Sequence, residues 1–157
     1  MRVHHLNCGS MCPVGFKYLG IHPAPHRIVC HVLLIETDQG LVLVDTGFGR
    51  DDLASPQARL GLAFLAVSRP TLDPAETAAE QIARLGFSVN DVRHIIPTHF
   101  DLDHIGGLAD FPRATVHVFE EELRAFRTRA TANEKQRYKS FHLAHDPTIE
   151  SYATGGD

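Results

Sequence analysis

The sequence predicts an α/β fold in which helices flank a mixed β-sheet. Two apolar segments, residues 28–36 and 41–45, have the length and composition of strands, and residues 37–40 between them have the chemistry of a hairpin turn. Two further strand-like segments, 92–98 and 114–119, stand next to segments with helical features. Strands that alternate with helices are typical of this fold class.

The first third of the chain is expected to hold three of the strands. Residues 2–7 predict a short strand, and residues 7–27, rich in Gly, Pro and His, predict a long loop. The two hairpin strands are apolar without interruption rather than alternating. This continuous pattern predicts that both faces of these strands are buried.

A helix is expected between the hairpin and the third long apolar segment. Asp73 has the chemistry of an N-cap, Pro74 fits the first helical position, and Glu76 fits the acidic position of a capping box. The helix should end at Gly86, and residues 88–91 should form one more turn. Pro97 cannot donate a ladder hydrogen bond, so strand pairing within 92–98 should end there.

The last third predicts one strand and one helix. Residues 114–119 alternate as a strand does, and the three glutamates at 120–122 complement the N-terminal dipole of the last predicted helix. No strand pattern follows residue 119. Basic residues gather here and indicate a solvated helical face: Arg124, Arg127, Arg129, Lys135, Arg137 and Lys139. If residues 141–145 are helical, His142 and His145 share one face, but neither is assigned to a site.

Composition narrows the function classes. The net charge of −4, without a continuous Lys/Arg stripe, argues against a nucleic-acid surface. The three cysteines form no paired framework, which favours a reducing compartment. We see no export signal and no apolar run long enough to cross a membrane, so a cytoplasmic protein is expected.

Residues 98–107 predict a metal site. Four possible ligands stand within six residues: His99, Asp101, Asp103 and His104. The two carboxylates would repel each other unless a cation lay between them. If the chain stays extended, the first three side chains point to one side, and a tight turn at Asp103 brings His104 to the same point. The glycines at 106 and 107 let the backbone pass close to the site.

These motifs resemble the metallo-β-lactamase superfamily, and especially its lactonase-like branch. Residues 98–107 resemble the family's signature loop, and residues 41–47 resemble its apolar strand that ends in Asp-Thr-Gly. The likeness covers residues 1 to about 126 in the family's order and spacing. It implies an αββα sandwich, of which this chain would form the N-terminal half with a mixed β-sheet and flanking helices.

The resemblance also implies a centre with two divalent metals, usually zinc, and a bridging hydroxide. It assigns His99 and Asp101 to one metal and Asp103 and His104 to the other, with Asp103 also taking up the proton. Asp101 stands where the family has a histidine, and its harder oxygen donors make iron or manganese plausible as well. Asp45 either orients a ligand histidine or forms a turn before Thr46, and the sequence leaves both open.

The function implied is a metal-dependent hydrolase that cleaves a lactone or another small ester through a metal-bound hydroxide. Residues 60–67 correspond to an insertion near the pocket mouth of the lactonase-like proteins, so they fit a substrate lid, ordinary packing or a dimer contact. The alternative is a truncated or degenerate member of the family that binds metal without activity of its own.

Residues 1–157 are expected to form a single domain that is incomplete relative to the family, because the family's later ligands lie downstream. A sandwich cut after its first sheet exposes an apolar sheet face. Homodimerisation or other association through that face is therefore expected.

Overall fold

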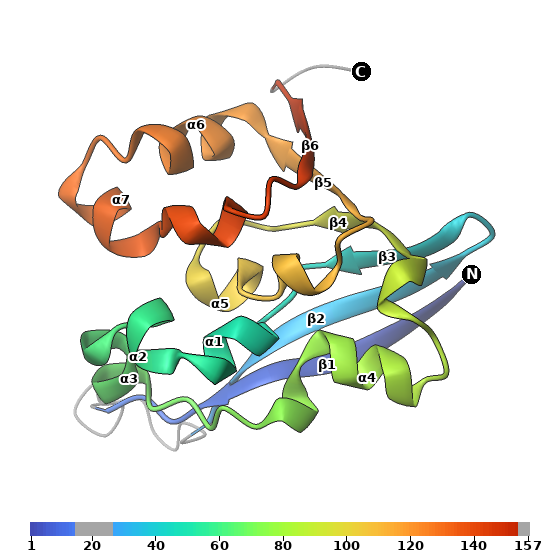
Figure 1. The fold of residues 1–157 in the computed structure, drawn as a ribbon, viewed down its shortest axis with the longest axis horizontal. Coiled ribbons are helices and arrows are strands. Elements are labelled where there is room, and N and C mark those ends of the chain that lie inside the picture. Colours follow the sequence, from blue (N-terminus) through green and yellow to red (C-terminus); the bar gives the residue numbers. More distant parts are fainter. Residues whose placement is uncertain (15–26, 154–157) are drawn as a thin grey trace, which may run out of the picture.

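A mixed β-sheet forms the centre of the molecule, as the sequence predicts (Figure 1). The computed structural model describes residues 1–14 and 27–153. Within them the sheet has six strands in the order β1-β2-β3-β4-β5-β6, antiparallel between β1, β2 and β3 and parallel from β3 onward. Their bounds are β1 Arg2–Met11, β2 Ile28–Thr37, β3 Gly40–Val44, β4 Val92–Ile96, β5 Thr115–Phe119 and β6 Thr148–Tyr152.

The predicted hairpin connects β2 and β3. Thr37 pairs with Gly40, and the Thr37 hydroxyl donates a hydrogen bond to the Gly40 carbonyl at 2.7 Å. Gly40 has φ +119, and a Cβ there would collide with the Arg93 side chain. Both its backbone angle and its crowded surroundings therefore favour glycine.

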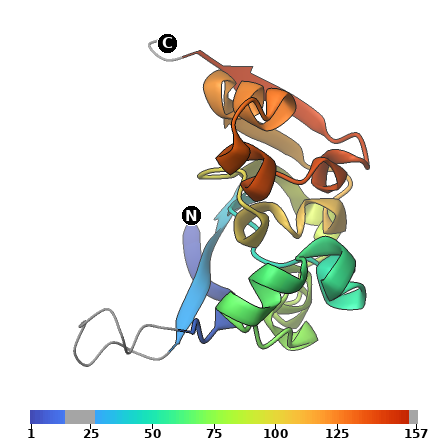
Figure 2. The ribbon, with the colours of Figure 1, turned by 90° about the vertical axis from the view of Figure 1, so that its left-hand side faces the viewer.

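The helices cover one face of the sheet (Figure 2). Their buried side chains, such as Ile82, Ile105 and Phe126, join buried strand residues such as Leu34 and Ile95 in one core. The helices are α1 Arg50–Ala54, α2 Pro56–Arg59, α3 Leu62–Ser68, α4 Ala78–Arg84, α5 Leu102–Ile105, α6 Glu120–Thr128 and α7 Ala132–Arg137. Single 3₁₀ turns lie at Pro74–Glu76, Val89–Asp91, Leu108–Asp110 and Ser140–Leu143.

The opposite face of the sheet is open within the described residues, so the prediction that β2 and β3 are buried on both faces is wrong. Val32, Leu34 and Leu43 are buried under the helices, whereas Leu33 and Val42 on the other face are only half-buried. The apolar pattern correctly predicts that both faces of β2 and β3 carry apolar side chains. It does not predict whether a helix or a second sheet packs on each face.

The N-terminal strand is longer than predicted. β1 continues to Met11, because Ser10 and Met11 pair with β2 after a β-bulge and both are buried, as is Cys8. The predicted loop at residues 7–27 therefore begins later, and its residues 15–26 lie outside the described residues.

The predicted helix at 73–86 is split in two. Asp73 caps the 3₁₀ turn, with the Ala75 N–H donating to its carboxylate at 2.9 Å. The chain then becomes extended at Thr77, whose hydroxyl caps α4. Glu76 does not close a capping box but accepts hydrogen bonds from the Ser10 N–H at 2.8 Å and the Ser10 hydroxyl at 2.7 Å. Glu76 therefore pairs with Ser10 on β1 instead of with the backbone at the start of its own helix.

The C-terminal segment differs most from the prediction. The helix predicted to begin at the three glutamates is α6, and a second helix, α7, follows it. β6 pairs with β5, although no strand is expected after residue 119. The capping box that starts α7, Thr131 with Glu134, is a readable signal. β6 is an edge strand on which only Ile149 is partly buried, so its hydrophobic periodicity is too weak to identify it. Among the described helices, none combines the length and apolar character that a membrane crossing requires.

Candidate metal centre

The site forms where the carboxyl ends of β3 and β4 lie side by side. These strands run parallel, with Val44 paired to Ile96, so the residues that follow them meet at one edge of the sheet. Pairing ends at Ile96, as Pro97 predicts. Asp45 and Thr98 are then held together, because the Thr98 N–H donates to the Asp45 carboxylate at 2.7 Å.

Asp45 is the buried anchor of the site. It is 4% exposed and has φ +61, a left-handed conformation that aspartate tolerates better than most residues. One carboxylate oxygen lies 2.9 Å from Nδ1 of His104. This contact orients the imidazole and leaves Nε2 of His104 free of that partner.

Two backbone segments cross tightly beneath the site. The Gly107 N–H donates to the Gly47 carbonyl and to the Thr46 hydroxyl, both at 3.1 Å, and the Thr46 N–H donates to the His104 carbonyl at 2.8 Å. A Cβ on Gly49 would collide with the backbone of Gly106 and Gly107. The close backbone approach predicted for the glycine pair is therefore present, and it is made against the Asp-Thr-Gly segment after β3.

The structure brings the four predicted ligands together. The rings of His99 and His104 lie 3.9 Å apart, Nε2 of His99 lies 3.3 Å from the Asp101 carboxylate, and Nε2 of His104 lies 3.8 Å from the Asp103 carboxylate. The route differs from the extended chain that the alternation predicts. Asp101 is the N-cap of α5, so Asp103 and His104 reach the site from a helical turn.

The electrostatics of His104 reflect this crowding of carboxylates. Burial by itself lowers the pKa of the imidazole, but the hydrogen bond to Asp45 and the charges of Asp103, Asp45 and Asp101 outweigh burial and raise it. A site that favours the protonated imidazole is a site of negative potential. Such a potential attracts a cation.

Asp101 already has a cationic partner, which the sequence did not identify. Its carboxylate accepts a hydrogen bond at 2.7 Å from Nε of Arg137, the last residue of α7. Of the six basic residues predicted to form a solvated face, Arg137 is thus bound to the candidate site. Its partner is thirty-six residues away in the sequence, so no local pattern signals the contact.

A second link ties the same loop to the C-terminal helices. The Phe100 N–H donates to the Glu122 carboxylate of α6 at 2.7 Å, and the Tyr138 hydroxyl donates to the same oxygen at 3.1 Å. The guanidinium of Arg137 lies over the Tyr138 ring, 5.1 Å from its centre. Residues 100 and 101 of the loop are therefore positioned by α6 and α7.

The donors fit a divalent cation in type, and the fit is uneven. By donor type, the imidazoles of His99 and His104 and the carboxylate of Asp103 suit zinc, iron or manganese. Their contacts are pairwise: the two rings lie 3.9 Å apart, and the Asp103 carboxylate lies 3.8 Å from Nε2 of His104. Asp101 shares its carboxylate with a guanidinium. Over residues 1–14 and 27–153, no three His, Cys, Asp or Glu side chains form a group that could hold a metal ion.

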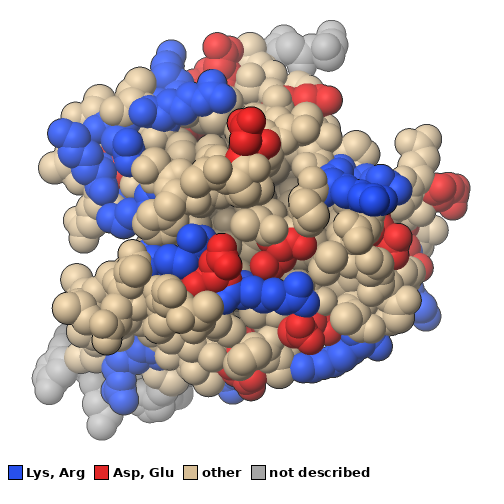
Figure 3. Space-filling view, viewed as in Figure 1, with Lys and Arg blue, Asp and Glu red and all other residues tan. Residues whose placement is uncertain are grey.

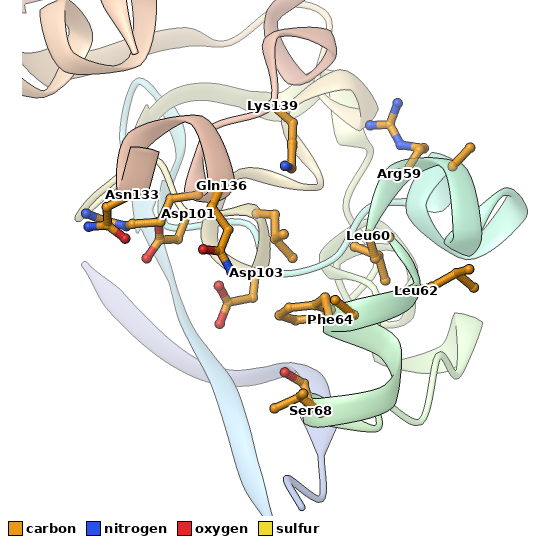
Figure 4. A pocket seen from close by; sticks show the side chains of 16 residues that line it. Arg59, Leu60, Leu62, Phe64, Ser68, Asp101, Asp103, Asn133, Gln136 and Lys139 are labelled. Carbon is orange, nitrogen blue, oxygen red and sulfur yellow. The ribbon is translucent and has the colours of Figure 1, made fainter. Parts of the chain in front are cut away.

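A pocket of about 650 Å³ opens beside these residues. Figure 3 shows Lys and Arg gathered over α6 and α7, and Figure 4 shows Asn133, Gln136 and Lys139 of this region across the pocket from Leu60 and Phe64. Asp101 and Asp103 also line it. The pocket therefore has one apolar wall, one polar and basic wall, and two of the candidate ligands.

Residues 60–67 serve both packing and the pocket. Leu60 is buried in a small cluster with Phe48 and Leu102, while Leu62 is 69% exposed. The same segment supplies the apolar wall of the pocket.

His142 lies apart from the candidate ligands. Its side chain is fully buried, Nε2 lies 3.5 Å from the Asp52 carboxylate, and neither ring nitrogen has a hydrogen-bond partner in the described part of the chain. The three cysteines are unpaired, and burial raises the pKa of the Cys8 thiol to about 12.

Comparison with known proteins gives a consistent assignment. Residues 27–155 match the family model described as the metallo-beta-lactamase superfamily. A "probable metallo-hydrolase" of Mycobacterium tuberculosis is 48% identical over 157 residues, which is all of this chain and 47% of that protein. The N-acyl homoserine lactonase AttM of Agrobacterium fabrum is 30% identical over 122 residues, covering 76% of this chain and 46% of AttM. The chain thus spans about half the length of the curated relatives it matches.

Solved structures share the fold. A mutant of B. thuringiensis AiiA, with N-decanoyl-L-homoserine bound at its active site, superposes with a TM-score of 0.71 at 20% identity, covering 96% of this chain and 59% of AiiA. AidC, described as a dizinc quorum-quenching lactonase, superposes with a TM-score of 0.58 at 20% identity, covering 99% of this chain and 59% of AidC. The predicted mixed sheet with flanking helices is confirmed as the arrangement of this fold.

Proposed function

The chain belongs to the metallo-β-lactamase superfamily, and from this premise we propose that its site serves a metal-dependent hydrolase acting on a lactone or another small ester. The observation that carries the proposal is that His104 contacts both His99 and Asp103 beside a pocket with an apolar wall. A divalent cation bound there would lower the pKa of a water molecule and polarise the carbonyl of an ester.

We assign a separate role in this activity to each residue of the candidate site. We assign His99, Asp101, Asp103 and His104 to metal binding, and Asp45 to holding Nδ1 of His104 so that Nε2 faces the site. We also assign Asp103, which lines the pocket and has no arginine partner of the kind that Asp101 has, to receive a proton from water. Zinc is the proposed metal, as in the structural neighbour AidC, which is described as a dizinc lactonase, and oxygen donors also suit iron or manganese.

The shape of the pocket supports the substrate class. Leu60, Leu62 and Phe64 offer an apolar surface for a hydrocarbon chain, and Asp103 lines the same pocket, so we assign the reacting end of the substrate to its side. Small lactones and esters with an apolar tail combine both features.

The free thiols support a cytoplasmic location, where cysteines stay reduced.

Binding of metal without turnover is the second candidate. It is favoured by one observation, that the described residues contain no group of three ligands ready to hold a cation. Two donors for each metal seldom fix the geometry that attack on an ester needs.

A chimera distinguishes the two candidates. Residues 1–157 would be joined to the segment of the M. tuberculosis relative that follows its matching region, and hydrolysis of N-acyl lactones and aryl esters would be measured with added Zn²⁺ or Mn²⁺. We expect hydrolysis by the chimera, loss of at least about a hundredfold with chelator or with His99→Ala, and little turnover by residues 1–157 alone. A folded, metal-loaded chimera without lactone or ester turnover would sink the proposed activity.

We also propose that the open sheet face drives association of the isolated chain. Val3, Ile96 and Phe119 are exposed, and Val42 and Val44 between them are half-buried, so this face is apolar and uncovered in the described residues. Sedimentation at micromolar concentration should show dimers or larger species, and Val42→Glu should shift them toward monomer. A monodisperse monomer that binds no hydrophobic dye would contradict this.

A further inference from the structure

The contact between Arg137 and Asp101 places a fixed positive charge on a proposed metal ligand. The hydrogen bond from Nε of Arg137 to Oδ1 of Asp101 is 2.7 Å long, and the other oxygen of Asp101 lies 3.3 Å from Nε2 of His99. The carboxylate therefore bridges a guanidinium and the nitrogen that would bind the first metal.

The position of Arg137 is set by the fold. Tyr138, 2% exposed, packs under the guanidinium and donates to Glu122, which in turn holds the Phe100 N–H of the metal loop. A surface arginine without such support would sample many rotamers. This one is held at the loop by the residues around it.

An aspartate at position 101 explains why Arg137 can pair with this point of the loop. The family resemblance places a histidine at this point of the loop, and an imidazole that binds a cation has no second acceptor for a guanidinium. A carboxylate has two oxygens and can accept from arginine with one of them. Asp101 and Arg137 therefore compensate each other's charge.

We propose that Arg137 is a built-in counter-ion for Asp101 that competes with the divalent cation for this carboxylate. The cation is then held mainly by His99, Asp103 and His104, and Asp101 contributes fully only when Arg137 is removed. The physical reason is that a guanidinium repels a nearby divalent cation and occupies one lone-pair direction of the ligand. The inference rests on the proposed function, because it assumes that the cluster binds a cation.

The test measures cation affinity rather than activity. Zn²⁺ and Mn²⁺ alone would be titrated into the full 157-residue chain by calorimetry and by competition with a chromophoric chelator. We expect Arg137→Gln to tighten binding about tenfold, which corresponds to about 1.4 kcal/mol. Arg137→Lys keeps the charge and should stay close to the parent. Lys139→Gln, which lines the same pocket without a contact to Asp101, is the matched control and should change affinity less than about threefold.

A double-mutant cycle isolates the competition. Asp101→Asn should weaken binding less than about threefold in the parent and at least about tenfold in the Arg137→Gln background. Weaker or unchanged binding by Arg137→Gln, with a parent-like near-UV spectrum, would overturn the inference and make Arg137 a support for the ligand. Absence of any cation binding by the parent, with His104→Gln indistinguishable from it, would instead overturn the proposed function.

Discussion

Two arginine–aspartate pairs in this molecule have the same contact and different surroundings. Arg59 donates from Nε to Asp52 at 2.7 Å, and Arg137 donates from Nε to Asp101 at 2.7 Å. The side chain of Asp52 is 0% exposed and that of Arg59 is 16% exposed, whereas those of Asp101 and Arg137 are 27% and 36% exposed. Burial, and not the length of the hydrogen bond, separates the two pairs.

The surroundings decide what each pair does. Asp52 also accepts from the Gly49 N–H at 3.1 Å, and His142 packs against it, so this pair joins α1 and α2 to residues 140–143 inside the molecule. The Asp101 pair faces the pocket and the candidate metal ligands. The same contact is therefore a structural link where water is excluded, and at the pocket it is the counter-ion contact that we propose above.

The largest expected effect is loss of the buried pair. Asp52→Ala removes the buried acceptor of Nε of Arg59 and of the Gly49 N–H and leaves Arg59 only the exposed Asp51 carboxylate at 3.9 Å, so we expect the free energy of unfolding to fall by about 3–5 kcal/mol. Asp101→Ala is the matched variant in the exposed pair and should cost about 1 kcal/mol or less after solvent screening. Urea unfolding monitored by circular dichroism measures both. Equal costs would mean that burial does not distinguish the pairs.

A smaller effect is expected from Asp110, which lies near the buried pair. Burial, with smaller contributions from the charges of Asp51 and Asp52, raises its pKa to about 6, although the Arg50 N–H donates to it. Because the pKa is higher in the folded state than the ordinary 3.8, the fold binds the proton more tightly. The free energy of unfolding should therefore fall by about 1–3 kcal/mol as pH rises from about 4 to about 7.

Asp110→Asn tests this pH dependence. Asparagine can still accept from the Arg50 N–H, and it carries no charge to desolvate. The variant should be more stable than the parent at pH 7, and the difference should shrink at pH 5, where the parent carboxyl is largely protonated. A difference that stays constant between these pH values would show that Asp110 does not titrate in this range.

Local sequence predicts which residues form much of the candidate site. It does not predict which charged partners those residues contact in the fold. The loop at residues 98–107, the strand before it and the Asp-Thr-Gly segment are contiguous motifs, so their residues and approximate places are predictable. The partners of those residues are not: Asp45 meets His104 across fifty-nine positions, and Asp101 meets Arg137 across thirty-six. Arg137 had the same local signal as the other basic residues of its segment, and only the packing of Tyr138 distinguishes it.

The sequence by itself determined the hairpin, the α/β alternation, the end of strand pairing before Pro97 and the four candidate donors of the loop at residues 98–107. Each of these depends on backbone chemistry or hydrophobic periodicity within a few residues. Tertiary structure decided that the helix at 73–86 splits, that β6 completes the described sheet, and that one sheet face stays open. It also decided which aspartate is buried with its arginine and which faces a pocket, because burial and partner choice depend on segments that meet only after the chain has folded.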